Sequence, residues 1–189
     1  MGKNKRMMLS KGDIAIRPLE KGDLPALRQW INDPLIMRRI GIEGIRTEEM
    51  QRQWFADLQD DDGRAVWAVC HGEVRSYIGN VSLYDIDRKH GHAGLAVFIG
   101  EESNRGKGYG GGAVRLMLEC AFRDMGLHRV YCKTEESFPG ALRLYESIGF
   151  TREGVLREHE RFDGSYVDKV LYGILEDEFR LDCVRVREE

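Results

Sequence analysis

The pattern of apolar and polar residues along this chain predicts a series of short strands. An entry strand over 13–18 alternates polar and apolar residues and ends at Pro18. Apolar stretches follow over 65–70, 77–84 and 93–99, and short polar or glycine-containing turns separate them. Successive strands joined by hairpin turns predict an antiparallel meander.

Further strands lie downstream of this meander. The apolar residues over 130–132 are reached through a helix, so their strand should run parallel to the strand over 93–99. The last strands begin at 149–151 and continue through 155–156 and 170–175. The strand pattern therefore predicts a mixed sheet that is mostly antiparallel.

Apolar residues at helical spacing predict helices between these strands. Helix-start and helix-end residues place them over 24–31, 47–58, 109–125 and 139–147. Residues 35–46 show no clear period. The chain is therefore predicted to be an α+β (mixed α/β) protein, with helices flanking one sheet.

Composition supports a single folded domain without a membrane segment. The chain has 189 residues, of which 42% are hydrophobic and 32% are charged. No apolar run approaches the ~18 residues of a transmembrane helix. We expect one domain over 13–182, a flexible lead at 1–12 and a C-terminal tail at 183–189.

The net charge limits the classes of binding partner, and the cysteine pattern indicates the cellular compartment. The net charge of -3 argues against a nucleic-acid binder held by a positive field. The four cysteines show no paired spacing, which indicates free thiols and a cytoplasmic protein.

A glycine-rich stretch, Arg105-Gly106-Lys107-Gly108-Tyr109-Gly110, lies between an apolar strand and a helix. Glycines let the backbone approach a ligand closely, and the helix start offers unpaired N–H groups, so the stretch predicts a phosphate site. It lacks the Ser or Thr of a P-loop. It also fits Gly-x-Gly-x-x-Gly, but no acid follows at the position expected in a dinucleotide-binding fold.

Two motifs together resemble the GNAT acetyltransferase superfamily. The first is Arg105-x-x-Gly108-x-Gly110, and the second is Ala141-x-x-Leu144-Tyr145-Glu146-x-x-Gly149-Phe150. The C-terminal run from 153 to 168 resembles the branch of ribosomal-protein N-terminal acetyltransferases and spermidine acetyltransferases. The resemblance covers about residues 14–179 and implies a twisted, mostly antiparallel sheet of about seven strands with about four helices.

The resemblance also implies a site. Acetyl-CoA would be the co-substrate, with Tyr145 as the general acid near its sulfur. Tyr84, Asp85 and His92 are candidates for the acceptor side. The residues implied in acetyl-CoA binding are Val97, Phe98, Ile99, Arg105, Gly106, Lys107, Gly108, Tyr109 and Gly110, with Arg105 and Lys107 near the phosphates.

The sequence departs from the family at two positions. Gly94 stands where many relatives have a glutamate, and Phe138 stands where relatives place an asparagine that helps to hold CoA. The general base therefore stays open, and a water is one candidate. No metal is expected, since His90-x-His92 has no third ligand at a supporting spacing. Arg38 and Arg39 form either a solvated face or a grip for an anion, and the solvated face is favoured.

Three functions follow from these residues. The first is an N-acetyltransferase that moves the acetyl group directly, in a ternary complex, to a primary amine such as a protein N-terminus, a polyamine or another small amine. The second is a non-catalytic acyl-CoA-binding regulator, and the third is a dinucleotide-binding oxidoreductase. A homodimer is expected from the family branch, with neither nucleic acid nor membrane as a partner.

Overall fold

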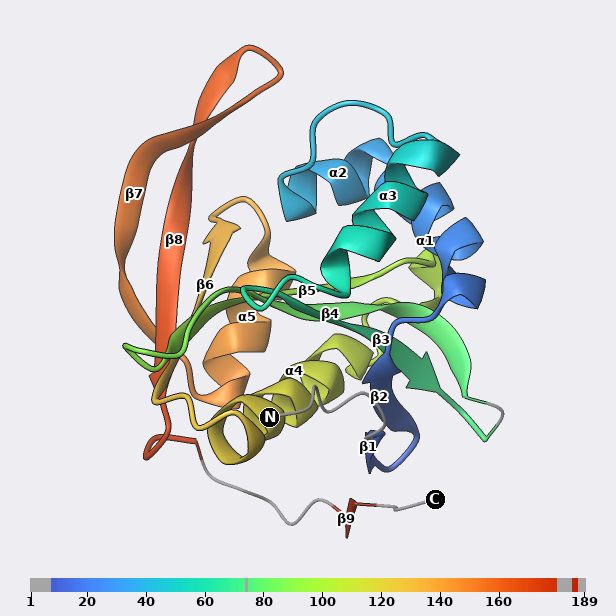
Figure 1. Cartoon of the computed structure of the whole chain (residues 1–189). Helices are drawn as coiled ribbons and strands as arrows, with labels where there is room; N and C mark the ends of the chain where they lie inside the picture. Colours follow the sequence, from blue (N-terminus) through green and yellow to red (C-terminus); the bar gives the residue numbers. More distant parts are fainter. Residues whose placement is uncertain (1–7, 74, 180–184, 187–189) are drawn as a thin grey trace.

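The computed structural model describes residues 8–73, 75–179 and 185–186, and these fold around one sheet (Figure 1). The strand order is β7-β8-β6-β5-β4-β3-β2-β1-β9. Among the described strands, β5 and β6 are the one parallel pair. The strands are β1 Leu9–Lys11, β2 Ile14–Pro18, β3 Ala65–His71, β4 Ser76–Asp87, β5 His92–Ile99, β6 Arg129–Glu135, β7 Thr151–Phe162, β8 Ser165–Leu175 and β9 Arg185–Val186.

The mostly antiparallel order confirms the expected mixed α/β fold. It also differs from the parallel doubly wound sheet that a dinucleotide-binding oxidoreductase would need. The predicted meander is present as β3-β4-β5, and β6 runs parallel to β5 as the intervening helix predicted.

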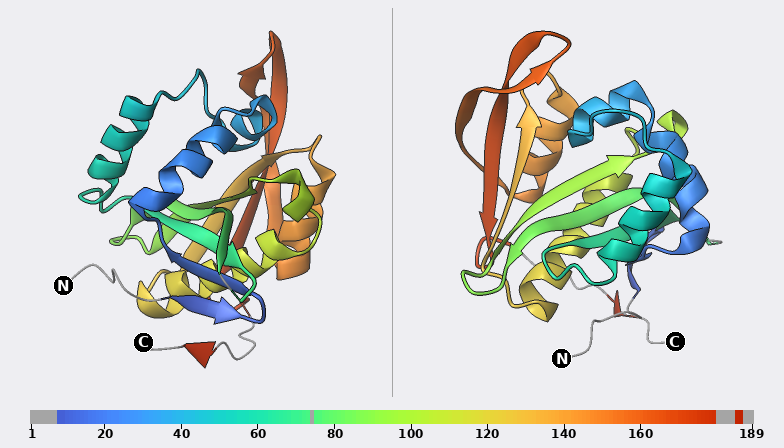
Figure 2. Two further views of the ribbon diagram at one scale, coloured as in Figure 1. Left: turned by 90° about the vertical axis from the view of Figure 1, so that its right-hand side faces the viewer. Right: turned by 45° about the horizontal axis from the view of Figure 1, so that its top comes forward.

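Helices cover both faces of the sheet, as Figures 1 and 2 show. Helices α1, α2 and α3 lie on one face, while α4 and α5 pack on the other. Their bounds are α1 Leu24–Ile31, α2 Pro34–Ile40, α3 Glu48–Leu58, α4 Tyr109–Glu119 and α5 Pro139–Ile148, with short 3₁₀ turns at Lys21–Asp23 and Glu102–Asn104 and a π turn at Cys120–Asp124. No helix of the described chain is long and apolar enough to cross a bilayer.

Helix α2 is the element that the sequence pattern did not reveal. The Asp33 carboxylate accepts a hydrogen bond from the Leu35 N–H at 2.8 Å, and Pro34 occupies the first helical position. Gly41 ends the helix in the left-handed region, with φ 67°. Local capping therefore turns part of the irregular stretch over 35–46 into a short helix above the sheet.

The ends of the chain add strands at one edge of the sheet. The expectation of a flexible lead over 1–12 is wrong for Leu9–Lys11, which pairs with β2 as β1. Arg185–Val186, within the expected tail, pairs with β1 as β9. Within the expected lead and tail, residues 1–7, 183–184 and 187–189 lie outside the described residues. The single-domain division over 13–182 stays a prediction.

Strands β5 and β6 are paired over only a short part of their length. They pair only over His92–Gly94 and Arg129–Tyr131, although β5 continues to Ile99 and β6 to Glu135. Beyond β6, the long β7–β8 hairpin rises away from the rest of the sheet (Figure 1). The separation leaves a gap between β5 and β6 in the middle of the molecule.

Candidate active site

The backbone of β5 offers hydrogen-bonding groups to this gap. The Gly100 N–H donates to the Ile78 carbonyl on β4 at 2.9 Å, which fixes the alternation of the β4–β5 ladder. Even-numbered positions of β5 therefore direct their N–H and C=O groups to β4, and odd-numbered positions direct them to the gap. By this alternation Val97 and Ile99 face the gap, whereas the backbone groups of Phe98 are used in the ladder.

The glycine loop lies at one end of the gap and has the backbone that its sequence predicts. Gly106 and Gly108 adopt φ values of 72° and 83°, in the region that favours glycine. Helix α4 begins at Tyr109, and its first helical bond runs from the Gly112 N–H to the Gly108 carbonyl at 3.0 Å. The N–H groups that precede Gly112 are available at the positive end of the helix dipole, which suits a phosphate.

The side chains of this loop have different roles from its backbone. The Arg105 Nε donates to the Ile99 carbonyl at 3.0 Å, and its guanidinium also contacts the Gly100 carbonyl. Arg105 therefore fastens the loop to the end of β5 rather than reaching outward. Lys107 is exposed, and the Tyr109 ring stacks on His71 at 4.6 Å.

Tyr145 lies on α5 with its ring in the core and lines the cavity beside the gap. The residue is 5% exposed, and its ring contacts Phe150 and Tyr172 at centroid distances of 5.3 and 5.9 Å. Its hydroxyl lies close enough to the Cys132 thiol on β6 for the thiol to affect its pKa. Burial, with a smaller contribution from Cys132, raises the pKa of Tyr145 well above its ordinary value. Tyr145 is therefore a neutral phenol at physiological pH.

Tyr84 explains why position 94 is a glycine. A Cβ built on Gly94 would lie 2.3 Å from the Tyr84 ring, so the tyrosine occupies the space that a side chain there would need. Tyr84 lines the cavity, and burial raises its pKa as well. Tyr84 and Tyr145 both line this cavity.

The other two acceptor-side candidates lie away from this point. Asp85 sits at an irregularity of β4 with φ 49°, and its negative charge helps to raise the pKa of Tyr131 after the larger effect of burial. The His92 ring lies between His90 and Tyr131, at centroid distances of 6.4 and 6.2 Å. The cavity lining includes Tyr84 but neither Asp85 nor His92. In the described part of the chain, no three His, Cys, Asp or Glu side chains are grouped as metal ligands.

A buried ion network crosses the gap, and the sequence pattern did not reveal it. Glu135 at the end of β6 accepts from Arg38 of α2 at 2.8 Å and from the Ser137 hydroxyl at 3.0 Å. Lys169 of β8 approaches Glu135 at 3.5 Å and Glu160 of β7 at 2.6 Å. Burial alone would raise the pKa of Glu135, but these cationic and hydroxyl partners bring it below its ordinary value.

This network corrects the interpretation of Arg38 as part of a solvated face. Its guanidinium pairs with Glu135 and also lies over the Phe138 and Phe162 rings, at 5.3 and 4.5 Å from their centroids. Arg39 lies over Phe138 at 5.5 Å. The aromatic residue at the family's asparagine position thus packs against two arginines of α2.

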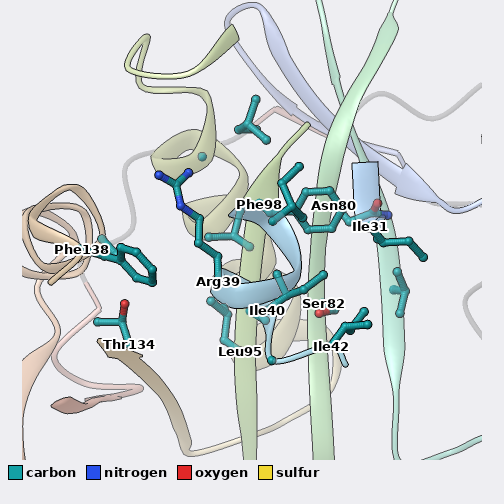
Figure 3. A pocket seen from close by; sticks show the side chains of 18 of the residues that line it. Ile31, Arg39, Ile40, Ile42, Asn80, Ser82, Leu95, Phe98, Thr134 and Phe138 are labelled. Carbon is teal, nitrogen blue, oxygen red and sulfur yellow. The ribbon is translucent and has the colours of Figure 1, made fainter. Parts of the chain in front are cut away.

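One large cavity joins these features. It has a volume of about 1840 Å³ and extends from the glycine loop, through the gap, to the space beneath α1, α2 and α3. Figure 3 shows Thr134 and Phe138 on one side and Ile31, Ile40 and Ile42 on the other, with Arg39 between them. The glycine loop and the space under the helices therefore open into one continuous volume.

Comparisons with known proteins agree with this geometry. Residues 13–151 match the model of the acetyltransferase (GNAT) domain family. The spermidine N(1)-acetyltransferase of Vibrio cholerae is 28% identical over 167 residues, covering 88% of this chain and 95% of the relative. The probable N-acetyltransferase YjcK of Bacillus subtilis is 31% identical over 177 residues, covering 89% of this chain and 97% of that protein.

A solved structure extends the likeness to three dimensions. The spermidine N-acetyltransferase of Vibrio cholerae, in complex with CoA and spermine, superposes with a TM-score of 0.84 at 26% identity, covering 89% of this chain and 98% of the other. The matched region contains both the glycine loop and the β5–β6 gap. The chain therefore belongs to the GNAT family, in its spermidine acetyltransferase-like branch, and is an acetyl-CoA-dependent N-acetyltransferase.

Proposed function

We propose that this chain transfers the acetyl group of acetyl-CoA directly to a primary amine while both substrates are bound. The observation that carries the proposal is the single cavity, whose lining includes the glycine loop, Tyr145 and the space under α1, α2 and α3. A thioester and an amine held at the two ends of one cavity can meet without a covalent enzyme intermediate. Holding them together is a large part of the catalysis that such a reaction needs.

The co-substrate would be held mainly by backbone groups. The loop from Gly106 to Gly110 and the start of α4 suit the phosphates, and Val97 on the free side of β5 suits the amide groups of the pantetheine arm. Because the Arg105 side chain bonds to the end of β5, its part would be to hold the loop in shape. The acyl group of acetyl-CoA comes already activated as a thioester, so the protein must orient it and manage protons.

Two phenols that line the cavity, Tyr145 and Tyr84, would take part in these proton transfers. Tyr145 keeps its proton at neutral pH and would give it to the departing thiolate. Tyr84 fills the position where many relatives have a glutamate, and burial keeps its phenol neutral too. A neutral phenol is a poor base, so we propose that a water held by Tyr84 and Ser82 relays the proton of the amine to bulk solvent, from which Tyr145 regains the proton that it gives up.

The test is acetyl-CoA binding together with thiol release over a panel of amines. Gly108→Val adds a side chain at φ 83° where the phosphates would lie, and it should abolish acetyl-CoA binding in calorimetry. Gly72→Val is the matched control, because Gly72 has φ 79°, is equally open, and lies outside the cavity lining.

The outcomes separate the candidate functions. Loss of binding in Gly108→Val but not in Gly72→Val, with thiol release by the native chain, supports the transferase. Binding of acetyl-CoA without thiol release for any amine would instead indicate the non-catalytic acyl-CoA regulator. Equal affinity of both variants for acetyl-CoA would show that the glycine loop does not bind the phosphates.

A further inference from the structure

The part of the cavity under α1, α2 and α3 has a distinct chemistry, and we call it the acceptor lobe. Its roof is formed by apolar side chains of these helices and the segment between α2 and α3. They are Ile31, Ile36, Ile40, Ile42, Met50 and Trp54. The Ile31, Ile40 and Ile42 side chains gather on one side of the cavity (Figure 3). An apolar roof of this extent favours a ligand with apolar surface of its own.

Hydrogen bonds hold part of this roof in a fixed position. The Asn32 side chain, at the end of α1, accepts from the Arg46 N–H at 2.7 Å and donates to the Arg46 carbonyl at 3.0 Å. These two bonds fix the segment that carries Ile42. The apolar surface is therefore a preformed feature of the lobe.

The floor of the lobe is polar but carries no charge. Asn80, Ser82 and Tyr84 alternate along β4 and line the cavity. Asn80 accepts from the Tyr77 hydroxyl at 2.6 Å and donates to the Trp67 carbonyl at 3.2 Å, so its hydrogen-bonding capacity is largely used. A floor of this kind can orient one amine but offers no carboxylate to a second cationic group.

The carboxylates around the lobe already have partners. Glu49 pairs with Arg52 at 3.6 Å, and Asp57 accepts from the Gln53 amide at 2.7 Å, both within α3. Glu160, on the far side, pairs with Lys169. Each acid that lines the cavity is thus engaged by a group of the protein itself.

The arginines that border the lobe are less compensated. Arg39 and Arg46 line the cavity, and within the described chain no carboxylate lies at ion-pair distance from either guanidinium. Arg39 is also affected by the positive charge of Arg105 and, to a smaller extent, by the negative charge of Asp33. Among the lining residues, Arg39 and Arg46 lack an ion-pair partner, and so does one carboxylate, Asp57, whose bond is to a neutral amide. The unpaired charge around the lobe is therefore net positive, and it would repel a ligand with several positive charges.

We propose that the acceptor is a primary amine attached to an apolar group and carrying no further positive charge. This inference rests on the proposed acetyl transfer and specifies its acceptor. A polyamine such as spermine, which accompanies the Vibrio cholerae relative, would bring extra cations against an apolar roof and unpaired arginines. Desolvating those cations without carboxylate partners is costly, so the lobe selects against them.

This chemistry occurs both in small aryl- or alkylamines and at peptide N-termini that begin with an apolar residue. The first measurement is kcat/KM of the native chain with phenethylamine, with the peptide amide Phe-Ala-Ala-NH₂ and with spermidine. We expect at least one of the two apolar amines to exceed spermidine by about tenfold or more, the scale on which apolar contacts discriminate. Preference between the two apolar amines identifies the source.

A pair of variants then assigns the preference to the lobe. Ile42→Glu places a carboxylate in the roof and should lower kcat/KM for the preferred apolar amine by about tenfold or more. The matched control is Ile45→Glu, since Ile45 is 75% exposed and does not line the cavity. The control should leave kcat/KM unchanged, and the KM for acetyl-CoA should stay the same in both variants.

The outcomes separate this inference from the proposed function. If spermidine is the preferred acceptor, the inference is overturned while acetyl transfer stands. If both variants lower the rate equally, the lobe is not where the preference arises. If no amine in the panel releases thiol, both the inference and the proposed acetyl transfer fail.

Discussion

Replacement of Tyr145 by phenylalanine tests the assignment of the proton donor most directly. The change removes only the hydroxyl, and the ring keeps its contacts with Phe150 and Tyr172. The lost hydroxyl has the Cys132 thiol, a weak polar group, as its neighbour, so the free energy of unfolding should fall by only about 1 kcal/mol. Acetyl-CoA affinity should change little, because the ring still fills its place.

The effect on turnover should be much larger than the effect on stability. Loss of a general acid lowers a rate by about 10²–10⁴-fold. This corresponds to roughly 3–5 kcal/mol of activation free energy, at about 1.4 kcal/mol for each factor of ten. Thiol release at saturating acetyl-CoA and amine measures this term, and urea unfolding measures the smaller structural term.

Tyr172→Phe is the matched control for this experiment. Tyr172 is a buried neighbour whose hydroxyl donates to Glu146 at 2.8 Å, and it does not line the cavity. Its variant should lose a similar amount of stability and keep its turnover. If Tyr145→Phe retains nearly full turnover, Tyr145 is a packing residue and the donor is a water or another group.

Further predictions concern stability, pH and assembly. Gly94→Ala should lower the free energy of unfolding by about 1–3 kcal/mol in urea, because its Cβ would meet the Tyr84 ring, whereas Gly111→Ala, which meets nothing, should not. Glu135→Gln should cost about 1–3 kcal/mol at neutral pH. Because the pKa of Glu135 is lowered, the difference between this variant and the native chain should disappear in unfolding curves as the pH falls below the ordinary value of 4.5. The raised pKa of Tyr145 stabilises the fold fully below pH 10.0 and less as the pH rises above it, so the alkaline loss of thermal stability should be smaller in Tyr145→Phe. Light scattering should show a homodimer, and a monomer at working concentration would contradict that expectation.

Much of the fold could be predicted because its signals are local. The meander β3-β4-β5 follows from alternating apolar residues and short turns, and the Thr47 cap of α3 follows from its own sequence, with the Thr47 hydroxyl accepting from the Met50 N–H. The glycine loop could be found because only glycine adopts its backbone without strain. Helix α2 was not predicted, because it is short and only Ile36 of its residues is buried.

The rest of the site depends on contacts between distant parts of the chain. Arg38 and Glu135 are separated by 97 positions, and neither residue has a local pattern that points to the other. The sequence shows that Gly94 lacks the glutamate side chain of many relatives, but only the fold shows that the Tyr84 ring occupies this space. The apolar roof of the acceptor lobe likewise arises only when three helices and a connecting segment converge.

The parting of β5 and β6 has a mechanical consequence. The ladder between β5 and β6 covers only the pairs from His92–Arg129 to Gly94–Tyr131. Within the sheet, the strands β2-β3-β4-β5 are therefore joined to the strands β6-β8-β7 by only a short stretch of pairing. A pantetheine arm lying along Val97 would substitute for the missing pairing, as an added strand does at a sheet edge. Acetyl-CoA would then link the two subsets of strands. Its binding would raise the free energy needed to separate β5 from β6. Hydrogen exchange of the backbone amides in β5 after Gly94 and in β6 after Tyr131 should slow when acetyl-CoA is added. The two subsets of strands should then unfold together rather than separately.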